Sequence, residues 1–180
     1  TFTEKSLLRT GNIYTTMKQF DKAVENYSKL ETVAEFEDNL VVSRVGLMRC
    51  HFLLKQFNQA SIYADKVIHA EKIFNELITE AHLIKGKSYL AMDSLPEARK
   101  ELQQISKFNS AMGAEAKYHL AYIQFRQRDY KECQETIFGI INQVPSYDYW
   151  VAKGFILLAE TYLKQDDAFQ AKQTLKSIVE

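Results

Sequence analysis

The stretch KGKSYLAMDSLPEARKELQQI, residues 85–105, predicts the end of one helix, a tight turn and the start of a second helix. Ser94 and Glu97 have the three-residue spacing of a capping box, which marks the beginning of a helix. Gly86 and Ala98 lie on either side of the turn, twelve residues apart. Small side chains at these positions let two helices approach within the packing distance of about 8–10 Å. The stretch therefore predicts a closely packed helical hairpin.

The same spacing recurs along the whole chain. The second helices carry a column of small residues at Ala23, Ala60, Ala98, Cys133 and Ala171. Twelve residues before each of them, in the first helix of the pair, lies another small or flexible residue: Gly11, Met48, Gly86, Ala121 and Ala159. Seven residues after each small residue comes an aliphatic one: Leu30, Val67, Ile105, Ile140 and Ile178. An ordinary helical bundle does not require such columns to recur in register, so the sequence predicts an array of repeats.

Apolar spacing predicts ten helices in five pairs and no strand. The expected pairs are 6–20 with a helix starting near 21, 41–54 with 57–70, 74–91 with 95–108, 111–127 with 130–142, and 147–164 with 168–180. The acidic segment 31–40 is expected to be an inter-repeat turn, either solvated or functional. Asp129, and Asp166 or Asp167, are predicted helix caps, and Pro145 is predicted to end a helix.

The repeats are expected at approximately 4–37, 41–74, 79–112, 114–147 and 152–180, forming one domain over residues 1–180. The first residue is Thr1 and the last falls inside a helical pattern, so we expect an excerpt of a longer chain or a processed form.

These columns resemble the tetratricopeptide repeat (TPR). The resemblance is carried by Gly11-Asn12-Ile13-Tyr14 with Phe20-Asp21-Lys22-Ala23, by Gly86-Lys87-Ser88-Tyr89 with Glu97-Ala98, and by the corresponding residues of the other repeats. The second repeat departs most, with Met48 and His51 in place of the small and aromatic residues. The resemblance implies an all-α, right-handed α-solenoid of about five tandem helix-turn-helix repeats. The run 114–145 also resembles bacterial cell-envelope TPR proteins.

Composition excludes several functions. Lys plus Arg and Asp plus Glu number 23 each, so a broad electrostatic surface for nucleic acid is not expected. No apolar run approaches the ~18 residues that span a bilayer, so direct membrane insertion is not expected. Cys50 and Cys133 are expected to be buried thiols without a disulfide. These observations are compatible with a location in the cytoplasm and with one in a bacterial periplasm or cell envelope.

No local signature of catalysis is present in the sequence. The histidines His51, His69, His82 and His119 lack metal-ligand spacing, and there is no phosphate-binding glycine loop or nucleophile elbow. Glu115 and His119 have the spacing to touch on one helix, and His51 is expected to pack in the core. We therefore expect no enzyme, no catalytic or metal site and no cofactor.

The resemblance implies that the first helices line a concave groove in which ligands lie. The residue after each small residue of a first helix should point into it, together with neighbouring aromatic and basic side chains. The candidate groove residues are Asn12, Arg49, Lys87, Tyr118, Tyr122, Phe125, Arg126 and Glu160. The family's clamp for a terminal carboxylate is not expected, because Leu8 and Gly46 stand where its basic and Asn residues would be.

The main hypothesis is a non-catalytic protein–protein interaction scaffold whose groove binds a peptide or helix of a partner protein. The alternative is a structural, self-associating segment of a larger assembly, in which exposed solenoid ends form a homo-oligomer. A reader of RNA by helical repeats is disfavoured by the even charge balance. The partner's identity cannot be deduced from these residues.

Overall fold

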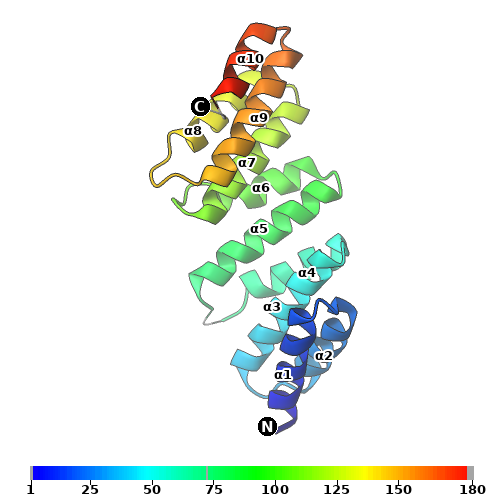
Figure 1. Ribbon diagram of the computed structural model, residues 1–180. Coiled ribbons are helices and arrows are strands. Elements are labelled where there is room, and N and C mark those ends of the chain that lie inside the picture. The colour runs from blue at the N-terminus through cyan, green and yellow to red at the C-terminus, as the bar shows by residue number, and fades with distance from the viewer. Residues whose placement is uncertain (1, 72, 178–180) are drawn as a thin grey trace. The chain divides into compact units, whose positions relative to one another are not determined.

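The computed structural model describes residues 2–71 and 73–177, and within them the chain forms ten α-helices and no strand (Figure 1). The helices are α1 (Phe2–Thr16), α2 (Phe20–Val33), α3 (Glu37–Leu53), α4 (Phe57–Ile68), α5 (Asn75–Ala91), α6 (Leu95–Ile105), α7 (Ala111–Arg126), α8 (Tyr130–Ile141), α9 (Asp148–Lys164) and α10 (Ala168–Lys176). The predicted all-α architecture of paired helices is confirmed.

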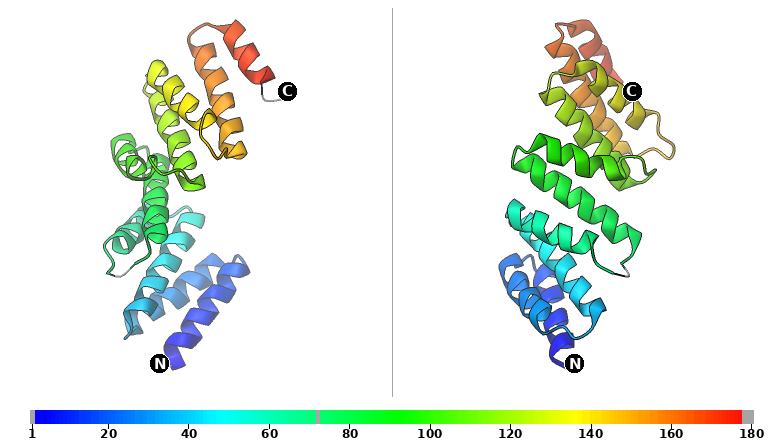
Figure 2. Two further views of the ribbon diagram at one scale, coloured as in Figure 1. Left: turned by 90° about the vertical axis from the view of Figure 1, so that its left-hand side faces the viewer. Right: turned by 180° about the vertical axis from the view of Figure 1, so that it is seen from behind.

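The chain divides into two compact units, 1–101 and 102–180, with the boundary inside α6. In unit 1, each helix from α1 to α4 packs on the next, and the first helix α3 also packs on the first helices α1 and α5. Unit 2 repeats this pattern, because α7, α8, α9 and α10 pack in order and α7 also contacts α9 (Figure 2). The assignment of all 180 residues to one domain of five repeats stays a prediction.

The columns read from the sequence are buried as expected. All five small residues of the second helices, and all five residues twelve positions earlier, are buried. The aliphatic column Leu30, Val67, Ile105 and Ile140 is buried as well, while Ile178 lies outside the described residues. Cys50 and Cys133 are free and buried, and burial raises the pKa of both thiols. Both cysteines therefore act as small packing residues.

Two helix starts differ from the prediction. Helix α1 begins at Phe2 instead of residue 6, and α3 begins at Glu37 instead of residue 41. Residues 37–39 are polar and residues 37–40 were assigned to a turn, but Glu37 and Asp38 form the acidic first turn of α3. Negative charge near the N-terminus of a helix is stabilising, which explains why these residues join the helix. The connection shrinks to residues 34–36.

The helix ends follow a shared geometry that the sequence did not reveal. In every hairpin the residue five positions before the small residue has a positive φ; these residues are Lys18, Lys55, Asp93, Arg128 and Asp166. The N–H of the following residue bonds to the carbonyl five positions back, as in Gln19 to Tyr14 at 2.9 Å. This is the Schellman motif, which satisfies the last carbonyls of a helix. Here no glycine supplies it, which is why it was missed.

The predicted caps have different outcomes. Asp167 accepts a hydrogen bond from the backbone N–H of Gln170 at 2.9 Å and caps α10. Asp129 occupies the N-cap position of α8, but its side chain makes no capping hydrogen bond, so that prediction was wrong. Helix α6 begins directly after Ser94, and α8 ends at Ile141, before Pro145.

Candidate functional site

A polar pocket lies on the first helices of unit 1, and two of the predicted groove residues line it. Asn12 on α1 and Arg49 on α3 occupy equivalent positions of successive hairpins. The pocket has a volume of about 230 Å³, and its lining is Asn12, Thr15, Thr16, Tyr27, Gly46 and Arg49. The structure thus brings together two side chains that lie 37 residues apart in the sequence.

The floor of this pocket is Tyr27, a residue of the second helix α2. Its ring is buried and passes between two glycines of neighbouring first helices. A Cβ atom at Gly11 would lie 2.7 Å from Tyr27 Cε1, and one at Gly46 would lie 2.6 Å from Tyr27 Cε2. Real Cβ atoms essentially never approach so closely, so both glycines are needed for the ring to reach the pocket. Sequence analysis did not name Tyr27 as a groove residue, because only the first helices were expected to line the groove.

Hydrogen bonds hold the pocket in one arrangement. The Tyr27 hydroxyl donates to Asn12 Oδ1 at 2.7 Å and lies 3.3 Å from Thr15 Oγ1. Burial raises the pKa of Tyr27, although the hydrogen bond with Thr15 opposes this, so the hydroxyl stays a proton donor. Because Tyr27 occupies the amide oxygen of Asn12, the amide NH₂ is the part of Asn12 that remains for a ligand.

Arg49 forms a bidentate ion pair with Glu80 of α5. Arg49 Nε lies 2.7 Å from Glu80 Oε1, and Arg49 Nη2 lies 2.6 Å from Glu80 Oε2. These hydrogen bonds raise the pKa of Arg49 in spite of its partial burial. The pair uses Nε and Nη2, so Nη1 is the guanidinium nitrogen that remains for a ligand. Asn12 and Arg49 together offer N–H donors, which suit a carbonyl or carboxylate oxygen.

Lys87, the third predicted groove residue of unit 1, has a different environment. Its Nζ lies 5.2 Å from the centre of the Phe52 ring, within the range of a cation–π contact. Lys87 is not among the residues that line the pocket of Asn12 and Arg49. Asn12 and Arg49 therefore share one pocket and Lys87 lies outside its lining, while the prediction that all three line a binding groove stays a prediction.

In unit 2 the predicted groove residues gather around an aromatic cluster. Tyr118, Tyr122 and Phe125 are partly buried against the core formed by α7, α8 and α9. The ring centre of Tyr118 lies 5.5 Å from that of Trp150, and Lys153 Nζ lies 5.3 Å from the Tyr118 ring centre. Burial raises the pKa of Tyr118.

The remaining members of this surface are Arg126 and Glu160, both exposed. Tyr149 was missed by the sequence analysis, as were Trp150 and Lys153. Tyr149 packs edge-on against Trp150, with ring centres 4.8 Å apart. The run Asp148-Tyr149-Trp150 at the start of α9 was the available signal, because two adjacent aromatic residues in a first helical turn cannot both face the core.

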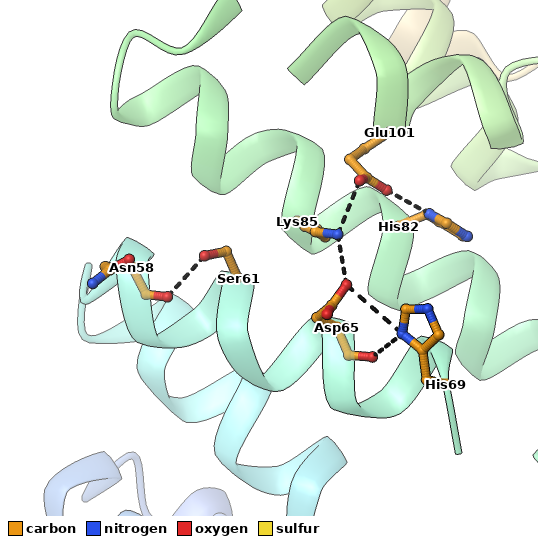
Figure 3. Close-up of polar contacts among 7 residues, drawn as sticks. All are labelled: Asn58, Ser61, Asp65, His69, His82, Lys85 and Glu101. Atoms are coloured by element: carbon orange, nitrogen blue, oxygen red, sulfur yellow. Dashed lines mark hydrogen bonds and ion pairs between the residues drawn. The ribbon is translucent and has the colours of Figure 1, made fainter. Parts of the chain in front are cut away.

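A second polar assembly lies between α4, α5 and α6 of unit 1 (Figure 3). Lys85 Nζ lies 2.8 Å from Asp65 Oδ1 and 3.0 Å from Glu101 Oε1, and His82 Nδ1 lies 2.7 Å from Glu101 Oε2. His69 lies beside Asp65, with its Nδ1 3.8 Å from Asp65 Oδ1. The side chains of Lys85 and Glu101 are largely shielded from solvent, and each provides an ion-pair partner for the charge of the other. This assembly ties three helices together and was not anticipated.

The histidines and acids do not converge on a metal site. Among the described residues, no group of three or more His, Cys, Asp or Glu side chains has a geometry that could hold a metal ion. His51 stacks on Tyr63 with ring centres 5.4 Å apart, in the packing role expected for it. His119 Nε2 lies 3.7 Å from Glu115 Oε1, so the two residues touch on one helix as predicted. Over the same described residues, no helix is long and apolar enough to cross a membrane.

The repeated two-helix unit, with small residues at each crossing, defines a protein of the tandem helical-hairpin class. Residues 4–35 match the family described as tetratricopeptide repeat. This match covers the first hairpin and confirms the resemblance to the tetratricopeptide repeat seen in the sequence. The finer likeness to bacterial cell-envelope members stays a prediction.

Solved structures support the fold over nearly the whole chain. A crystal structure of MamA protein matches with a TM-score of 0.80 and 18% identity, covering 98% of this chain and 90% of that one. YrrB, described as a TPR protein with an unusual peptide-binding site, matches with a TM-score of 0.71 and 14% identity, covering 96% of this chain and 83% of that one. The nearly identical TPR-like repeats of a kinesin light chain from Podosopora anserina match with a TM-score of 0.72 and 16% identity, covering 97% and 92%. No functionally curated protein has a matching sequence.

Proposed function

We propose that this protein is a non-catalytic scaffold that binds a peptide or helix of a partner protein on the face formed by its first helices. The observation that carries the proposal is the pocket of unit 1, where Asn12 and Arg49 of successive hairpins line one cavity together with Tyr27, whose hydroxyl bonds to Asn12. The TPR fold and the peptide-binding site ascribed to YrrB add support.

The pocket favours an extended peptide that presents a backbone carbonyl or a side-chain carboxylate. Asn12 Nδ2 and Arg49 Nη1 are donors, while the hydroxyls of Thr15 and Thr16 can donate or accept. A volume of about 230 Å³ accommodates one small polar group rather than a whole cofactor. The wider affinity would come from contacts along the helices, such as those of Lys87 and Phe52 in unit 1.

In unit 2 the proposed binding surface is aromatic. Tyr118, Tyr122 and Phe125, with Arg126 and Glu160 at the exposed positions, would contact apolar and charged side chains of the partner. Aromatic rings supply large contact areas at low cost in conformational entropy, which suits them to recognition of protein surfaces. Each surface is proposed for its own unit.

The test uses peptides selected from a displayed random-peptide library against the purified chain. Selected peptides are titrated by calorimetry against Arg49→Glu/Lys87→Glu and against Tyr27→Phe. We expect the double variant to weaken binding by about 10-fold or more, and Tyr27→Phe to weaken it less, because it removes one hydroxyl and frees Asn12.

The matched control is Lys29→Glu/Lys55→Glu, which makes the same change in net charge at exposed positions on α2 and in the turn between α3 and α4. Circular dichroism must show that every variant keeps its helical content. Equal affinity of a selected peptide for Arg49→Glu/Lys87→Glu and for the parent chain would place binding on another face and overturn the proposal.

A further inference from the structure

The pocket of Asn12 and Arg49 contains one charged side chain, and that charge is compensated. Of the six residues that line the pocket, only Arg49 is a cation, and none is an acid. Glu80 lies outside the lining, and its two carboxylate oxygens are 2.7 and 2.6 Å from Arg49 Nε and Nη2. Hydrogen bonds to Glu80 are the largest cause of the raised pKa of Arg49. A ligand that contacts Arg49 therefore meets the negative charge of Glu80 as well.

The hydroxyl groups of the pocket already use their hydrogens. Thr16 Oγ1 donates to the backbone carbonyl of Asn12 at 3.0 Å. Thr15 Oγ1 donates to the backbone carbonyl of Gly11 at 2.9 Å, and the Tyr27 hydroxyl donates to Asn12 Oδ1 at 2.7 Å. A hydroxyl group has one hydrogen and two lone pairs, so each of these oxygens is left to a ligand as an acceptor.

The pocket thus combines acceptors with donors. Asn12 Nδ2 and Arg49 Nη1 take no part in the hydrogen bonds to Tyr27 and Glu80 described above, so they remain as donors. The oxygens of Thr15 and Tyr27 also contact each other, 3.3 Å apart, which makes Thr16 Oγ1 the less engaged acceptor. Donors and acceptor line one cavity of about 230 Å³.

A primary carboxamide matches this set of groups better than a charged side chain or the peptide backbone does. Its carbonyl oxygen accepts and its NH₂ donates, and both lie at the tip of the side chain. A carboxylate only accepts, whereas ammonium and guanidinium groups only donate. The backbone peptide group has a donor and an acceptor, but they point to opposite sides of a trans peptide. A small pocket therefore receives both polar atoms of a carboxamide and only one of a backbone amide.

We propose that the pocket binds the side-chain carboxamide of an asparagine or glutamine in the partner's peptide and discriminates against aspartate and glutamate. The inference rests on the proposed function and narrows it to one class of side chain. The carboxamide oxygen accepts from Asn12 Nδ2 and Arg49 Nη1, and its NH₂ donates to Thr16 Oγ1. A carboxylate in the same place lies beside the charge of Glu80 and leaves Thr16 Oγ1 without a donor, and both effects lower its affinity.

This assignment makes Glu80 a specificity-determining residue, although it does not line the pocket. Glu80→Gln keeps the size of the side chain and an oxygen that accepts from Arg49, but it removes the compensating charge. Arg49 then becomes an uncompensated cation beside the ligand, and a guanidinium forms strong paired hydrogen bonds with a carboxylate. The variant should therefore favour an acidic residue where the parent chain favours the amide.

The test repeats the selection from a displayed random-peptide library with the parent chain and with Glu80→Gln. Peptides selected by the parent chain should share an asparagine or glutamine at one position, and those selected by Glu80→Gln should share an acidic residue there. A peptide from the parent selection, and its analogue with the corresponding acidic residue, are then titrated by calorimetry. The parent chain should bind the amide peptide roughly 10-fold more tightly, and Glu80→Gln should abolish or reverse this preference.

Two further variants separate specificity from general damage. Glu25→Gln, at an exposed site on α2, makes the same change in net charge and should keep the preference of the parent chain. Thr16→Val removes the acceptor and should weaken the amide peptide roughly 3-fold or more, while the affinity of the acidic analogue stays unchanged. A merely structural effect of Thr16→Val would weaken both peptides equally. Circular dichroism checks that each variant keeps its helical content.

The inference is overturned if the selected peptides share no asparagine or glutamine, or if the acidic analogue binds the parent chain equally well. An unchanged preference in Glu80→Gln, or an equal loss of both peptides in Thr16→Val, also contradicts it. In each of these cases, loss of binding in Arg49→Glu/Lys87→Glu still supports the proposed function. If that double variant binds as the parent chain does, the proposed function fails and this inference fails with it.

Discussion

The two units build the same hairpins and use one buried position in opposite ways. In unit 1 the position holds Tyr27, whose ring passes between two glycines and delivers a hydroxyl to a surface pocket. In unit 2 the equivalent residue is Ile137, which fills the core against Leu157 and Leu158. Register in a helical repeat thus fixes where a side chain goes, while the residue type decides whether that place serves packing or recognition.

The contacts between helices differ in the same manner. In unit 1, charged pairs join separate helices: Arg49 with Glu80, Lys85 with Asp65 and Glu101, and Lys66 with Glu31. In unit 2, aromatic rings meet between α7 and α9, and amides join the helices, as Gln134 does with Gln165 at 2.7 Å. The structure of unit 1 should therefore respond to pH more strongly than that of unit 2.

The largest expected effect tests the Tyr27 position. Gly46→Ala should lower the free energy of unfolding of unit 1 by about 2–3 kcal/mol, because the added methyl group meets a ring that Gly11 confines from the other side. Urea denaturation followed by circular dichroism measures the effect.

Gly139→Ala is the matched control, because a Cβ atom at this α8 glycine meets nothing within 4 Å. It should raise stability by about 0.5–1 kcal/mol, as alanine does in an open helix interior. Adding Tyr27→Leu to Gly46→Ala should recover part of the loss. Equal stability of Gly46→Ala and the parent chain would contradict the assigned role of the glycine.

An intermediate effect is expected from the charged assembly of Figure 3. Glu101→Gln should lower the free energy of unfolding by about 2 kcal/mol at neutral pH, since it removes the charge that Lys85 and His82 contact. Chemical denaturation at several pH values, compared with Glu25→Gln at an exposed site of α2, measures the loss.

The pH dependence of this loss has a defined sign. Burial alone would raise the pKa of Glu101, but hydrogen bonds with His82 and Lys85 outweigh it and lower the pKa below the ordinary 4.5. The stabilisation is therefore present above pH 4.5 and disappears as the pH falls through the lowered pKa. Lys85 determines the pH dependence of stability in alkaline solution. Burial opposes its charge, but hydrogen bonds and ion pairs with Asp65 and Glu101 raise its pKa above the ordinary 10.5. Its contribution is therefore lost only as the pH rises through this raised pKa. A difference between parent and variant that is constant from acid to neutral pH would exclude this role.

The smallest effect should be equal in both units, because the turns are the same. Lys55→Gly in unit 1 and Arg128→Gly in unit 2 should each raise stability by about 0.5–1 kcal/mol, since glycine adopts positive φ without the steric cost that other residues bear. Thermal or urea unfolding measures both. Lys29→Gly within α2 is the control and should lower stability by about 1 kcal/mol. A gain in one unit only would show that the turns differ in strain.

The fold was predictable because its cause is periodic. The twelve-residue interval between Gly86 and Ala98 separates the two positions at which the helices of one hairpin cross closely. The same interval recurs in the other hairpins and predicts where their helices cross. The turn geometry was not predictable from residue type, because the positions with positive φ, Lys18 and its equivalents, are not occupied by glycine.

The site was predictable only in part, for a reason of geometry. The exposed side of a first helix follows from its spacing, so Asn12 and Arg49 could be named. The path of Tyr27 could not, because it depends on the absence of two side chains on neighbouring helices. The ion pairs of Lys85 likewise require the register between hairpins, which no local pattern gives.

Because the Tyr27 ring passes between Gly11 and Gly46, we expect substitutions at these three positions to be coupled. A side chain larger than hydrogen at either glycine meets the ring and lowers stability while the ring is present, and the constraint ends once a smaller residue replaces the tyrosine. Related sequences should therefore show these three positions changing together, with tyrosine found alongside both glycines. Where the tyrosine is absent, the two helix positions should vary freely among small residues, and the pocket should be absent with it.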